Sequence, residues 1–339
     1  MRVMVTGGTG FIGAHTTKAL LDAGHHVTLL IRRPGRVDEN LKPLGAHGFD
    51  YVVGDMLDEG SVLEAMDGCD AVIHAGAVVS LSRGRADEVL DANPRGARIV
   101  IDAAIRLGLD PIVHVSSASA LFSPDVPLLH AQLPVAQAGN AYGRSKALAE
   151  EHARRRQEEG APVTITYPGA VVGPPAGTAF GEAAPSIVLE FRFGALPVRD
   201  AAWSVLDVRD LGAIHAAALQ PGRGPRRYMC GGHFMTIDQL AGVYRHLTGR
   251  RFPVIPVPAP AVRGLGRLMD VVTRVVPLES VFTEEGMSYL THWVRTDDRA
   301  IGEDLGIELR DPAETFAGAI RSLYRAGKLS RREIGKLVP

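Results

Sequence analysis

Tyr142 and Lys146 are the two residues whose types and spacing best suit catalysis. They lie four residues apart in a stretch, 141–159, that predicts a helix, so both side chains fall on one face. A tyrosine hydroxyl has an ordinary pKa of about 10, which is too high for a base at neutral pH. A lysine ammonium within a few ångströms favours the phenolate and lowers that pKa. The pair could therefore give a proton to a carbonyl oxygen or take one from an alcohol.

A Tyr-x-x-x-Lys spacing is common on helices and is weak evidence by itself. A strand that ends in serines strengthens the interpretation of the pair as catalytic. Residues 112–116 predict a strand, and serines stand at and after its last position. The carboxyl end of such a strand lies at the edge of an open α/β sheet, where ligands bind. Ser117 could hydrogen-bond a substrate oxygen there and stabilise the charge that develops on it. Ser116 and Ser119 are alternatives for the same role.

The glycine-rich segment 6–13 follows a predicted strand directly and opens a predicted helix, 11–23. One glycine allows a sharp turn, another lets backbone N–H groups approach a pyrophosphate, and a third lets the helix pack closely on the strand. The pyrophosphate would lie at the positive end of the helix dipole. The segment therefore predicts a dinucleotide site formed by Gly7, Gly10, Phe11, Ile12 and Gly13. In such a site Lys146 could also hold the hydroxyls of the nicotinamide ribose.

The end of the second predicted strand, 26–31, indicates which dinucleotide binds. A carboxylate there would accept hydrogen bonds from the adenosine ribose and repel a 2′-phosphate, but none occurs before Asp38. Arg32 and Arg33 stand there instead, and the forked donor of arginine suits a phosphate. We therefore expect NADP(H) to be preferred over NAD(H). The alternative is that these arginines form a solvated strand end and that NAD is used.

Two later strand ends would complete the dinucleotide site. Asp55 and Met56 follow the third predicted strand, where the Asp55 carboxylate could accept from an adenine amino group or simply form a turn. His74 ends the fourth strand and is expected to be packed in the sheet rather than to act as a base. The residues after it are small and leave room for a cofactor against the backbone: Ala75, Gly76 and Ala77.

These features together resemble the extended short-chain dehydrogenases/reductases, which include the NAD-dependent epimerase/dehydratase group. The motifs that carry the resemblance span about two thirds of the chain: 6–13, Asp55, 74–77, Asn93 with Gly96, Ser116 and Ser117, Tyr142 with Lys146, and 207–210. The resemblance implies a catalytic triad of Ser117, Tyr142 and Lys146. It also implies that Asn93 lies near the nicotinamide and that Pro168 belongs to the cofactor site. From the sequence alone, Asn93 is a plausible cap of a helix over 93–107.

Short apolar strands separated by helices fill the first half of the chain, which is typical of a parallel sheet covered on both faces. We expect an α/β fold, a doubly wound parallel sheet of the Rossmann type, in residues 1–170. A smaller C-terminal substrate lobe is expected in 171–339, with 204–219 returning to the Rossmann body. The remaining expected elements are an extended segment, 252–260, and two helices, 262–276 and 312–326. By resemblance, a homodimer would form through the helices 93–107 and 141–159.

Within this family, one kind of enzyme is favoured. The arginines after the second strand, the serine run and a proline-rich segment before a C-terminal helix resemble dihydroflavonol reductases and hydroxysteroid dehydrogenases. Those enzymes act on a carbonyl–alcohol pair of a largely apolar substrate. The apolar segment 121–139 could line a pocket for such a substrate or simply pack onto the body. We therefore expect an NAD(P)-dependent oxidoreductase that acts on a small apolar substrate.

Two other functions stay open. Sugar-nucleotide epimerases and dehydratases retain their cofactor and bind a diphosphate, for which Arg192, Arg199 and Arg209 are candidates. Those members usually carry an arginine where this chain has Tyr167 before Pro168. A non-catalytic dinucleotide sensor is the second alternative, although such proteins normally lack the tyrosine or the lysine.

Bulk composition sets the remaining expectations. A net charge of -1 over 339 residues gives no field suited to nucleic acid. The two cysteines form neither a disulfide framework nor a metal-ligand spacing. The chain has neither a secretory signal nor the roughly 18 apolar residues of a membrane span, so we expect a cytoplasmic enzyme with a small-molecule substrate and no membrane partner. The apolar stretch 262–276, which carries Arg263, Arg267 and Arg274, is expected to face the core of the lobe, and association with a membrane surface is the alternative for it.

Overall fold

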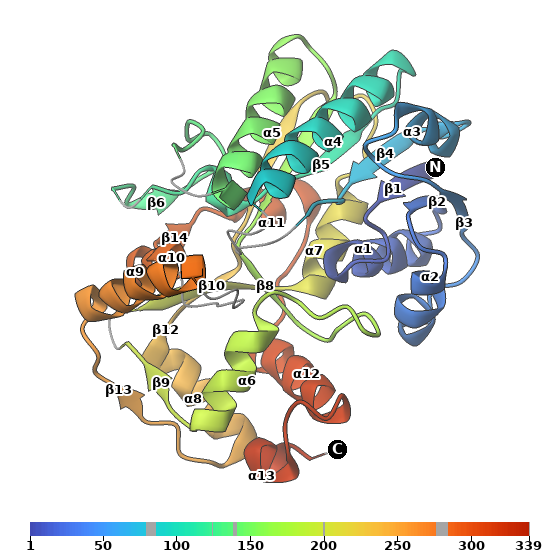
Figure 1. The fold of residues 1–339 in the computed structure, drawn as a ribbon. Coiled ribbons are helices and arrows are strands. Elements are labelled where there is room, and N and C mark those ends of the chain that lie inside the picture. The colour runs from blue at the N-terminus through green and yellow to red at the C-terminus, as the bar shows by residue number, and fades with distance from the viewer. Residues whose placement is uncertain (79–85, 124, 138–140, 199–200, 276–283, 339) are drawn as a thin grey trace.

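A seven-stranded parallel sheet forms the body of the protein, in a computed structural model that describes residues 1–78, 86–123, 125–137, 141–198, 201–275 and 284–338 (Figure 1). Its strands are β1 (Arg2–Thr6), β2 (His26–Ile31), β3 (Asp50–Val53), β4 (Ala71–His74), β5 (Ile112–Val115), β7 (Val163–Pro168) and β11 (Arg226–Cys230). The strand order is β11-β7-β5-β4-β1-β2-β3, so the chain reverses direction across the sheet between β1 and β4. This is the expected doubly wound topology, and ligands bind at the carboxyl ends beside such a reversal.

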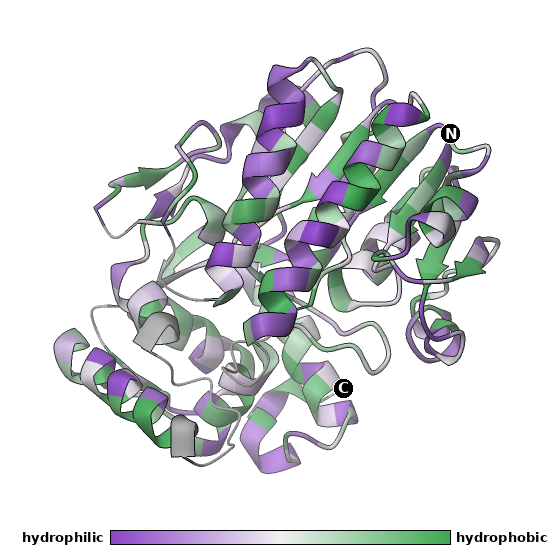
Figure 2. Cartoon of the chain, turned by 45° about the horizontal axis from the view of Figure 1, so that its top comes forward, coloured by the Kyte–Doolittle hydropathy of each residue, from purple (hydrophilic) through white to green (hydrophobic). Residues whose placement is uncertain are grey.

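Helices cover both faces of this sheet. One face carries α1 (Phe11–Asp22), α2 (Gly35–Asn40) and α7 (Val208–Ala217), and the other carries α3 (Glu59–Met66), α4 (Ala86–Arg106) and α5 (Ala141–Glu158). Successive strand residues enter two separate cores, since Met4 packs with α3 to α5 whereas Val3 and Val5 pack with α1. Figure 2 shows the hydrophobic strands beneath helices whose outward sides are hydrophilic. The continuous burial of these strands follows from this double coverage.

A smaller lobe is built mainly from the C-terminal half. Its three-stranded sheet contains β8 (Ala170–Val172), β10 (Ala202–Asp207) and β12 (His233–Thr236). Its longer helices are α6 (Ala184–Phe193), α8 (Ile237–Thr248), α9 (Ala259–Val275), α10 (Glu284–His292) and α12 (Pro312–Arg325). Phe191, Tyr244, Phe252 and Phe316 form the aromatic centre of its core. The lobe lies below the carboxyl ends of the main strands (Figure 1).

Shorter elements join the two parts. The pair β6 (Leu128–Leu129) and β14 (Arg295–Thr296) links the segment after β5 to the chain that follows α10. The other short elements are β9 (Leu196–Pro197), β13 (Val254–Ile255), α11 (Arg299–Leu305), α13 (Arg331–Ile334), and the 3-10 turns Lys42–Leu44, Ala118–Ala120 and Gly335–Leu337. Of the segment expected to return to the body, α7 packs on α1, whereas β10 pairs with β8 and β12. The edge strand β11 also comes from the C-terminal half.

Two expected boundaries were wrong. The helix expected to begin at Asn93 begins at Ala86 and contains Pro94 in its interior. The segment expected to be extended over 252–260 contains no helix before residue 259 and includes β13, but α9 already begins at Ala259. Asn140, a candidate cap for α5, lies outside the described residues. No helix in the described part of the chain is both long and apolar enough to cross a membrane.

Candidate active site

The loop after β1 is shaped by glycines. Gly7 has a φ of 70°, and a Cβ on it would lie 2.7 Å from the backbone nitrogen of Gly76. A Cβ on Gly13 would lie 2.1 Å from the carbonyl oxygen of Gly7, so the first turn of α1 packs directly on the loop. Gly10 precedes α1 without a side-chain hydrogen bond to cap the helix. The loop has no room for side chains at Gly7 and Gly13, and the N–H groups at the start of α1 have no side-chain cap. Both features fit the binding of a dinucleotide pyrophosphate.

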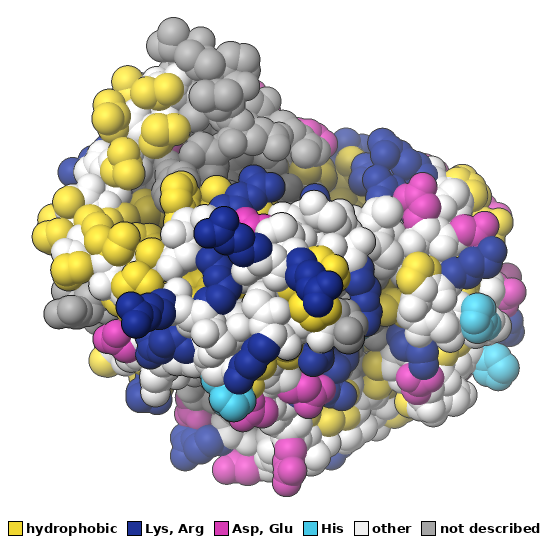
Figure 3. Space-filling view, turned by 90° about the horizontal axis from the view of Figure 1, so that it is seen from below, with side chains coloured by type: hydrophobic (Ala, Val, Ile, Leu, Met, Phe, Trp, Pro, Cys, Tyr) yellow, Lys and Arg dark blue, Asp and Glu magenta, His cyan; other side chains and the backbone are white. Residues whose placement is uncertain are grey.

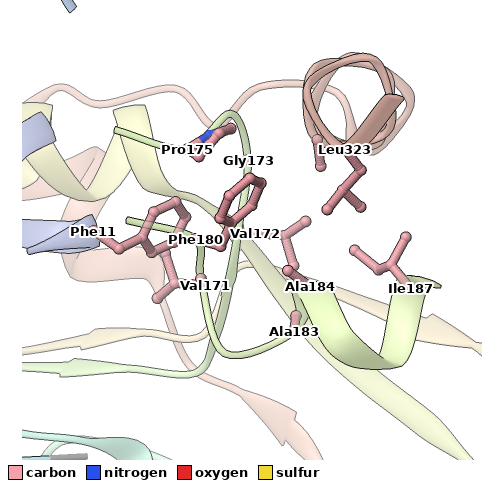
Figure 4. A pocket seen from close by; sticks show the side chains of 12 residues that line it. Phe11, Val171, Val172, Gly173, Pro175, Phe180, Ala183, Ala184, Ile187 and Leu323 are labelled. Carbon is pink, nitrogen blue, oxygen red and sulfur yellow. The ribbon is translucent and has the colours of Figure 1, made fainter. Parts of the chain in front are cut away.

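The side chains that open α1 serve packing. Ile12 packs against the cluster of Leu206 and Leu211, and the ring of Phe11 lies edge-on to His15 at 5.9 Å. Phe11 also lines a small apolar pocket together with residues of the loop after β8, of α6 and of α12 (Figure 4). None of the three candidate catalytic residues lines that pocket. The contribution of Phe11 and Ile12 to a dinucleotide site would therefore come from their backbone N–H groups.

Asn40 holds the glycine loop in place, a role that sequence analysis did not find. Its amide nitrogen donates to the carbonyl oxygen of Thr9 at 2.8 Å, and its side-chain oxygen accepts from the backbone and the hydroxyl of Thr178, both at 3.0 Å. Asn40 is buried, so these bonds lie away from solvent. They fix the loop after β8 over the glycine loop. A polar residue at the end of a short helix gave no signal of this bridge.

The residues at the other strand ends surround the glycine loop. Arg32 and Arg33 are exposed at the end of β2, and Asp38 forms an ion pair with Lys42 within the following helix and turn. Asp55 accepts the backbone N–H of Leu57 at 3.0 Å, which is the turn role considered for it. The small residues after β4 approach both neighbours: Ala75 donates to the carbonyl of Thr6, Gly76 lies close to the sulfur of Met56, and Ala77 is half-buried beside them.

Lys146 is buried on α5 and carries the positive charge of the catalytic end. Its Nζ donates to the carbonyl oxygen of Val115 at 3.4 Å and lies 6.0 Å from the ring centroid of Tyr142. Burial lowers the pKa of Lys146 to about 8, while Glu182 and Glu150 act in the opposite direction. The carbonyl of Val115, the last residue of β5, therefore holds the Lys146 ammonium beside Tyr142, which lies one helical turn earlier on α5.

Ser117 follows β5 with its hydroxyl oriented by its neighbour. Its oxygen accepts from the backbone nitrogen of Ser119 at 3.2 Å and lies 2.9 Å from the Ser119 hydroxyl. With its oxygen in the accepting role, the Ser117 hydrogen is left to donate to a substrate oxygen. Ser116 is buried, and its hydroxyl has no hydrogen-bond partner among the described residues. Of the three serines, Ser117 is the half-buried one and can best meet a ligand.

Asn93 is a buried residue inside α4, which corrects its expected role as a helix cap. Its side-chain oxygen accepts from the backbone nitrogen of Val78 at 2.7 Å, and its amide donates to the Val78 carbonyl at 2.9 Å and to the Ser145 hydroxyl at 3.0 Å. Ser145 donates in turn to the carbonyl of Tyr142 at 2.8 Å. Both amide hydrogens are thus used within the protein. Asn93 joins the chain after β4 to the first turn of α5.

Two histidines lie beneath the catalytic end on neighbouring strands. The rings of His74 and His114 stack with centroids 5.5 Å apart and an angle of 17° between planes. Thr6 bonds His74 through its hydroxyl at 2.7 Å, whereas both ring nitrogens of His114 lack a partner in the described part of the chain. Burial lowers the pKa of His74 to about 3 and that of His114 well below its ordinary value. Both rings are therefore neutral and add no charge below Lys146.

Glu182 stands opposite Lys146 on the loop that covers the glycine loop. A Cβ on the preceding Gly181 would lie 2.6 Å from the ring of Phe11, which fixes the path of this loop. The Glu182 side chain is exposed to solvent, yet surrounding protein raises its pKa and the charge of Lys146 lowers it. Glu182 is therefore a solvent-accessible carboxyl group that interacts electrostatically with Lys146. The sequence contained no motif that pointed to it.

The candidates for a diphosphate site are not brought together. Arg209 forms ion pairs with Asp207 at 2.7 Å and with Glu314 at 3.0 Å, so its charge is already paired within the protein. Arg192 ends α6, near α13 and far from α5 in Figure 1, and Arg199 lies outside the described residues. Within the apolar segment 121–139, Phe122 and Leu133 pack against the main core.

Comparisons with known proteins agree with this geometry. The model of the "NAD dependent epimerase/dehydratase family" matches residues 3–231. The protein named Sterol demethylase protein B from Methylococcus capsulatus is 29% identical over 338 residues, which cover 97% of this chain and 100% of that protein. Cinnamoyl-CoA reductase 1 of Oryza sativa subsp. japonica is 27% identical over 271 residues, or 76% of this chain and 78% of that protein.

The fold is also similar to solved structures. The structure of a UDP-glucose-4-epimerase from Stenotrophomonas maltophila, solved with bound NAD and formylated UDP-arabinopyranose, superposes with a TM-score of 0.76. The alignment covers 97% of this chain and 100% of that chain at 19% sequence identity. At this identity the similarity concerns the arrangement of the elements and carries no statement about the substrate.

Proposed function

Because this chain belongs to the NAD dependent epimerase/dehydratase family, we propose that it transfers a hydride between NADP(H) and a carbonyl–alcohol pair on a small apolar substrate. One observation carries the proposal: the buried ammonium of Lys146 is fixed on the carbonyl of Val115 and lies 6.0 Å from the ring of Tyr142. This pair stands at the same sheet edge as the glycine loop after β1. A non-catalytic sensor would have no use for such a pair.

In this proposal three side chains act on one substrate oxygen. The nicotinamide supplies or accepts the hydride when the cofactor is bound. Tyr142 donates its hydroxyl proton to the carbonyl oxygen, and the Lys146 ammonium stabilises the phenolate that is left. Ser117 donates a hydrogen bond to the same oxygen and stabilises the developing negative charge. In the oxidative direction the same groups act in reverse, with Tyr142 as the base.

The preference for NADP(H) rests on the end of β2. Arg32 and Arg33 are exposed there, and the nearest following acid, Asp38, is paired with Lys42. A 2′-phosphate on the adenosine ribose would find two guanidinium groups and no competing carboxylate. The rest of the dinucleotide would lie along the residues that line the strand ends: Gly7, Gly10, Phe11, Ile12, Gly13, Asp55, Met56, Ala75, Gly76, Ala77 and Pro168.

The substrate is proposed to be apolar because the candidate arginines among the described residues, Arg192 and Arg209, form no diphosphate site. Arg209 is paired within the protein, and Glu182 places a carboxyl group opposite Lys146. One relative carries a name that refers to a sterol, which agrees with an apolar ligand. A sugar-nucleotide epimerase is the second candidate, because the family to which this chain belongs also contains epimerases and dehydratases.

Turnover with paired cofactors tests the proposal. The purified protein is incubated with NADPH or NADH and with a panel of aromatic ketones, sterol ketones, aliphatic aldehydes and sugar nucleotides. Net oxidation of NADPH with an apolar carbonyl is the expected result. Conversion of a sugar nucleotide with no net change in the cofactor would contradict the proposal and support the epimerase.

A further inference from the structure

Helix α9 turns an apolar stripe toward solvent. The side chains of Leu265, Leu268 and Val271 are 48%, 58% and 53% exposed. They follow one another at three-residue spacings and so lie on one side of the helix. Val262 and Gly266, on the other side, are buried. Figure 3 shows the resulting group of hydrophobic side chains at the left, beside the grey residues.

This orientation is the reverse of that of an ordinary surface helix. Such a helix buries its apolar stripe in the core and presents its charged residues to water. The sequence-based expectation that this stretch faces the core of the lobe is therefore wrong for Leu265, Leu268 and Val271. A helix that exposes its apolar stripe is stable in water only because a narrow second face, with Val262, holds it to the protein. The stripe is left for another surface to cover.

The charges of α9 lie along one flank of the stripe. Successive residues of a helix are rotated by about 100° around its axis. Going round α9 from the Val271 side of the stripe, Arg267 comes first, Arg263 second and Asp270 third. Arg267 is exposed, and the guanidinium of Arg263 reaches Thr291 on α10 at 2.9 Å. An apolar stripe with cations at its flank is the pattern of a helix that lies in the interface of an anionic bilayer.

The area of the stripe disfavours a second copy of the chain as its occupant. A stable protein–protein interface buries about 800 Å² on each partner. Among the described residues of the stripe, three half-exposed aliphatic side chains supply only a small part of that area. Insertion among lipid headgroups needs no matching surface, because each apolar side chain gains independently from leaving water.

The same helix is connected to the catalytic end through aromatic contacts. Helix α9 packs on α10, and the ring of Tyr289 on α10 lies 4.8 Å from that of Phe122. Trp293 stacks on Phe122 at 5.4 Å with an angle of 11°. Phe122 belongs to the segment that begins with Ser117, the proposed substrate-binding serine. The exposed stripe therefore lies on the part of the lobe that adjoins the active site.

We propose that α9 docks this protein on an anionic lipid bilayer, with Leu265, Leu268 and Val271 inserted among the headgroups and Arg267 at the lipid phosphates. Docking would place the lobe beside the phase in which an apolar substrate dissolves. That benefit rests on the proposed function, whereas the docking itself does not. The expectation of no membrane partner would then hold for a spanning helix only.

Sedimentation of the full chain with vesicles tests the docking without substrate or cofactor. The vesicles are phosphatidylcholine alone and phosphatidylcholine mixed with phosphatidylglycerol. We expect binding to the mixed vesicles, and at least tenfold weaker binding to phosphatidylcholine alone. The double variant Leu265→Glu/Leu268→Glu should lose at least tenfold in affinity for the mixed vesicles. Leu148→Glu is the matched control, because Leu148 on α5 is 45% exposed and lies outside the stripe.

The unfolding temperature and dinucleotide affinity of each variant show whether it is folded. Binding of the double variant equal to that of the wild type would overturn the proposal, as would a wild-type chain that stays in the supernatant with both vesicles. A wild-type dimer that the double variant converts to a monomer would also overturn it, since the stripe would then be an interface between copies. Vesicle binding without any carbonyl reduction would leave docking supported and reject the proposed function instead.

Discussion

The side-chain amide of Asn93 on α4 donates to the hydroxyl of Ser145 on α5 at a distance of 3.0 Å. The Ser145 hydroxyl donates in turn to the carbonyl of Tyr142. Asn93 also hydrogen-bonds the backbone N–H and carbonyl of Val78. One buried amide therefore fixes the chain after β4 relative to the helix that carries the proposed acid. Such networks are costly to disrupt because each buried group left without a partner loses its solvation as well.

Replacing Asn93 with alanine should lower the free energy of unfolding by roughly 2–6 kcal/mol, since the Val78 N–H and carbonyl lose their partners at about 1–3 kcal/mol each. Turnover should fall further than dinucleotide affinity, because the first turn of α5 loses its anchor. Urea unfolding and cofactor titration measure the two effects. Wild-type stability in Asn93→Ala would show that the network does not hold α5. Ser145→Ala serves as the partner variant, and its effect should not add fully to that of Asn93→Ala.

The cofactor preference should depend on the arginines after β2. Arg32→Ala/Arg33→Ala should weaken NADPH binding by tenfold or more and leave NADH binding within about twofold, because only NADPH carries the 2′-phosphate. Fluorescence titration with both dinucleotides measures the ratio. Arg155→Ala, an exposed arginine on α5, is the control and should change neither affinity. An equal loss of affinity for NADPH and NADH in the double variant would show that these arginines do not recognise the 2′-phosphate.

Dinucleotide binding should depend on pH through Lys146. Its pKa of about 8 means that the ammonium is present below that pH and is lost as the pH rises through it. We expect the affinity to fall above about pH 8, by at most tenfold per pH unit because one proton is involved. In Lys146→Met this fall should be absent, and affinity should be low throughout. Titration of both proteins between about pH 6 and about pH 10 measures it. An identical profile in the variant would show that another group titrates.

The fold should be sensitive to acid because four histidines are buried in the neutral form. Burial lowers the pKa of His15 to about 4 and those of His74 and His215 to about 3, and that of His114 well below its ordinary value. Since their pKa in the unfolded chain is about 6.5, the unfolded state binds more protons below that pH. Stability is thus fully present above about pH 6.5 and is lost as the pH falls toward 4. The free energy of unfolding changes with pH by up to about 1.4 kcal/mol per pH unit for each of these histidines.

His114→Phe tests this reasoning, because neither ring nitrogen of His114 has a partner among the described residues. Urea unfolding at a series of pH values should show a slope smaller by one proton than that of the wild type. His26→Gln, at an exposed position, is the control and should leave the slope unchanged. A wild-type slope in the His114→Phe variant would mean that His114 is already charged or solvated in the folded protein.

The elements that the sequence predicted well are bounded by local signals. β1, β2, β4 and β5 are short apolar runs, and α1 and α5 are followed by glycine. β11 was missed because it begins with two arginines and exists only through pairing with β7, which is distant in sequence. The apolar stripe of α9 was assigned to the core because a helical pattern shows a stripe but not the surface that covers it.

In the candidate site, too, some features could be recognised in the sequence and others depend on contacts between distant segments. The glycine loop and the Tyr142–Lys146 pair depend on spacing within one segment, so they could be recognised in the sequence. The roles of Asn40 and Asn93 depend on partners in other segments, since Asn40 meets Thr178 across 138 positions. Glu182 likewise gains its place only when its loop folds over the body. Long-range hydrogen bonds of this kind leave no periodic trace along the chain.

The central claim is that Tyr142 exchanges a proton with the substrate oxygen, and Tyr142→Phe tests it most directly. The variant removes one oxygen atom and keeps the ring that packs beside Val78 and Val89. The measurement is its rate of NADPH oxidation with a carbonyl that the wild type reduces, together with its NADPH affinity. The account predicts a rate lower by at least a thousandfold with NADPH affinity within about threefold, in line with the about 10²–10⁴-fold contribution of a positioned acid. A Tyr142→Phe protein that reduces the carbonyl at the wild-type rate would contradict it.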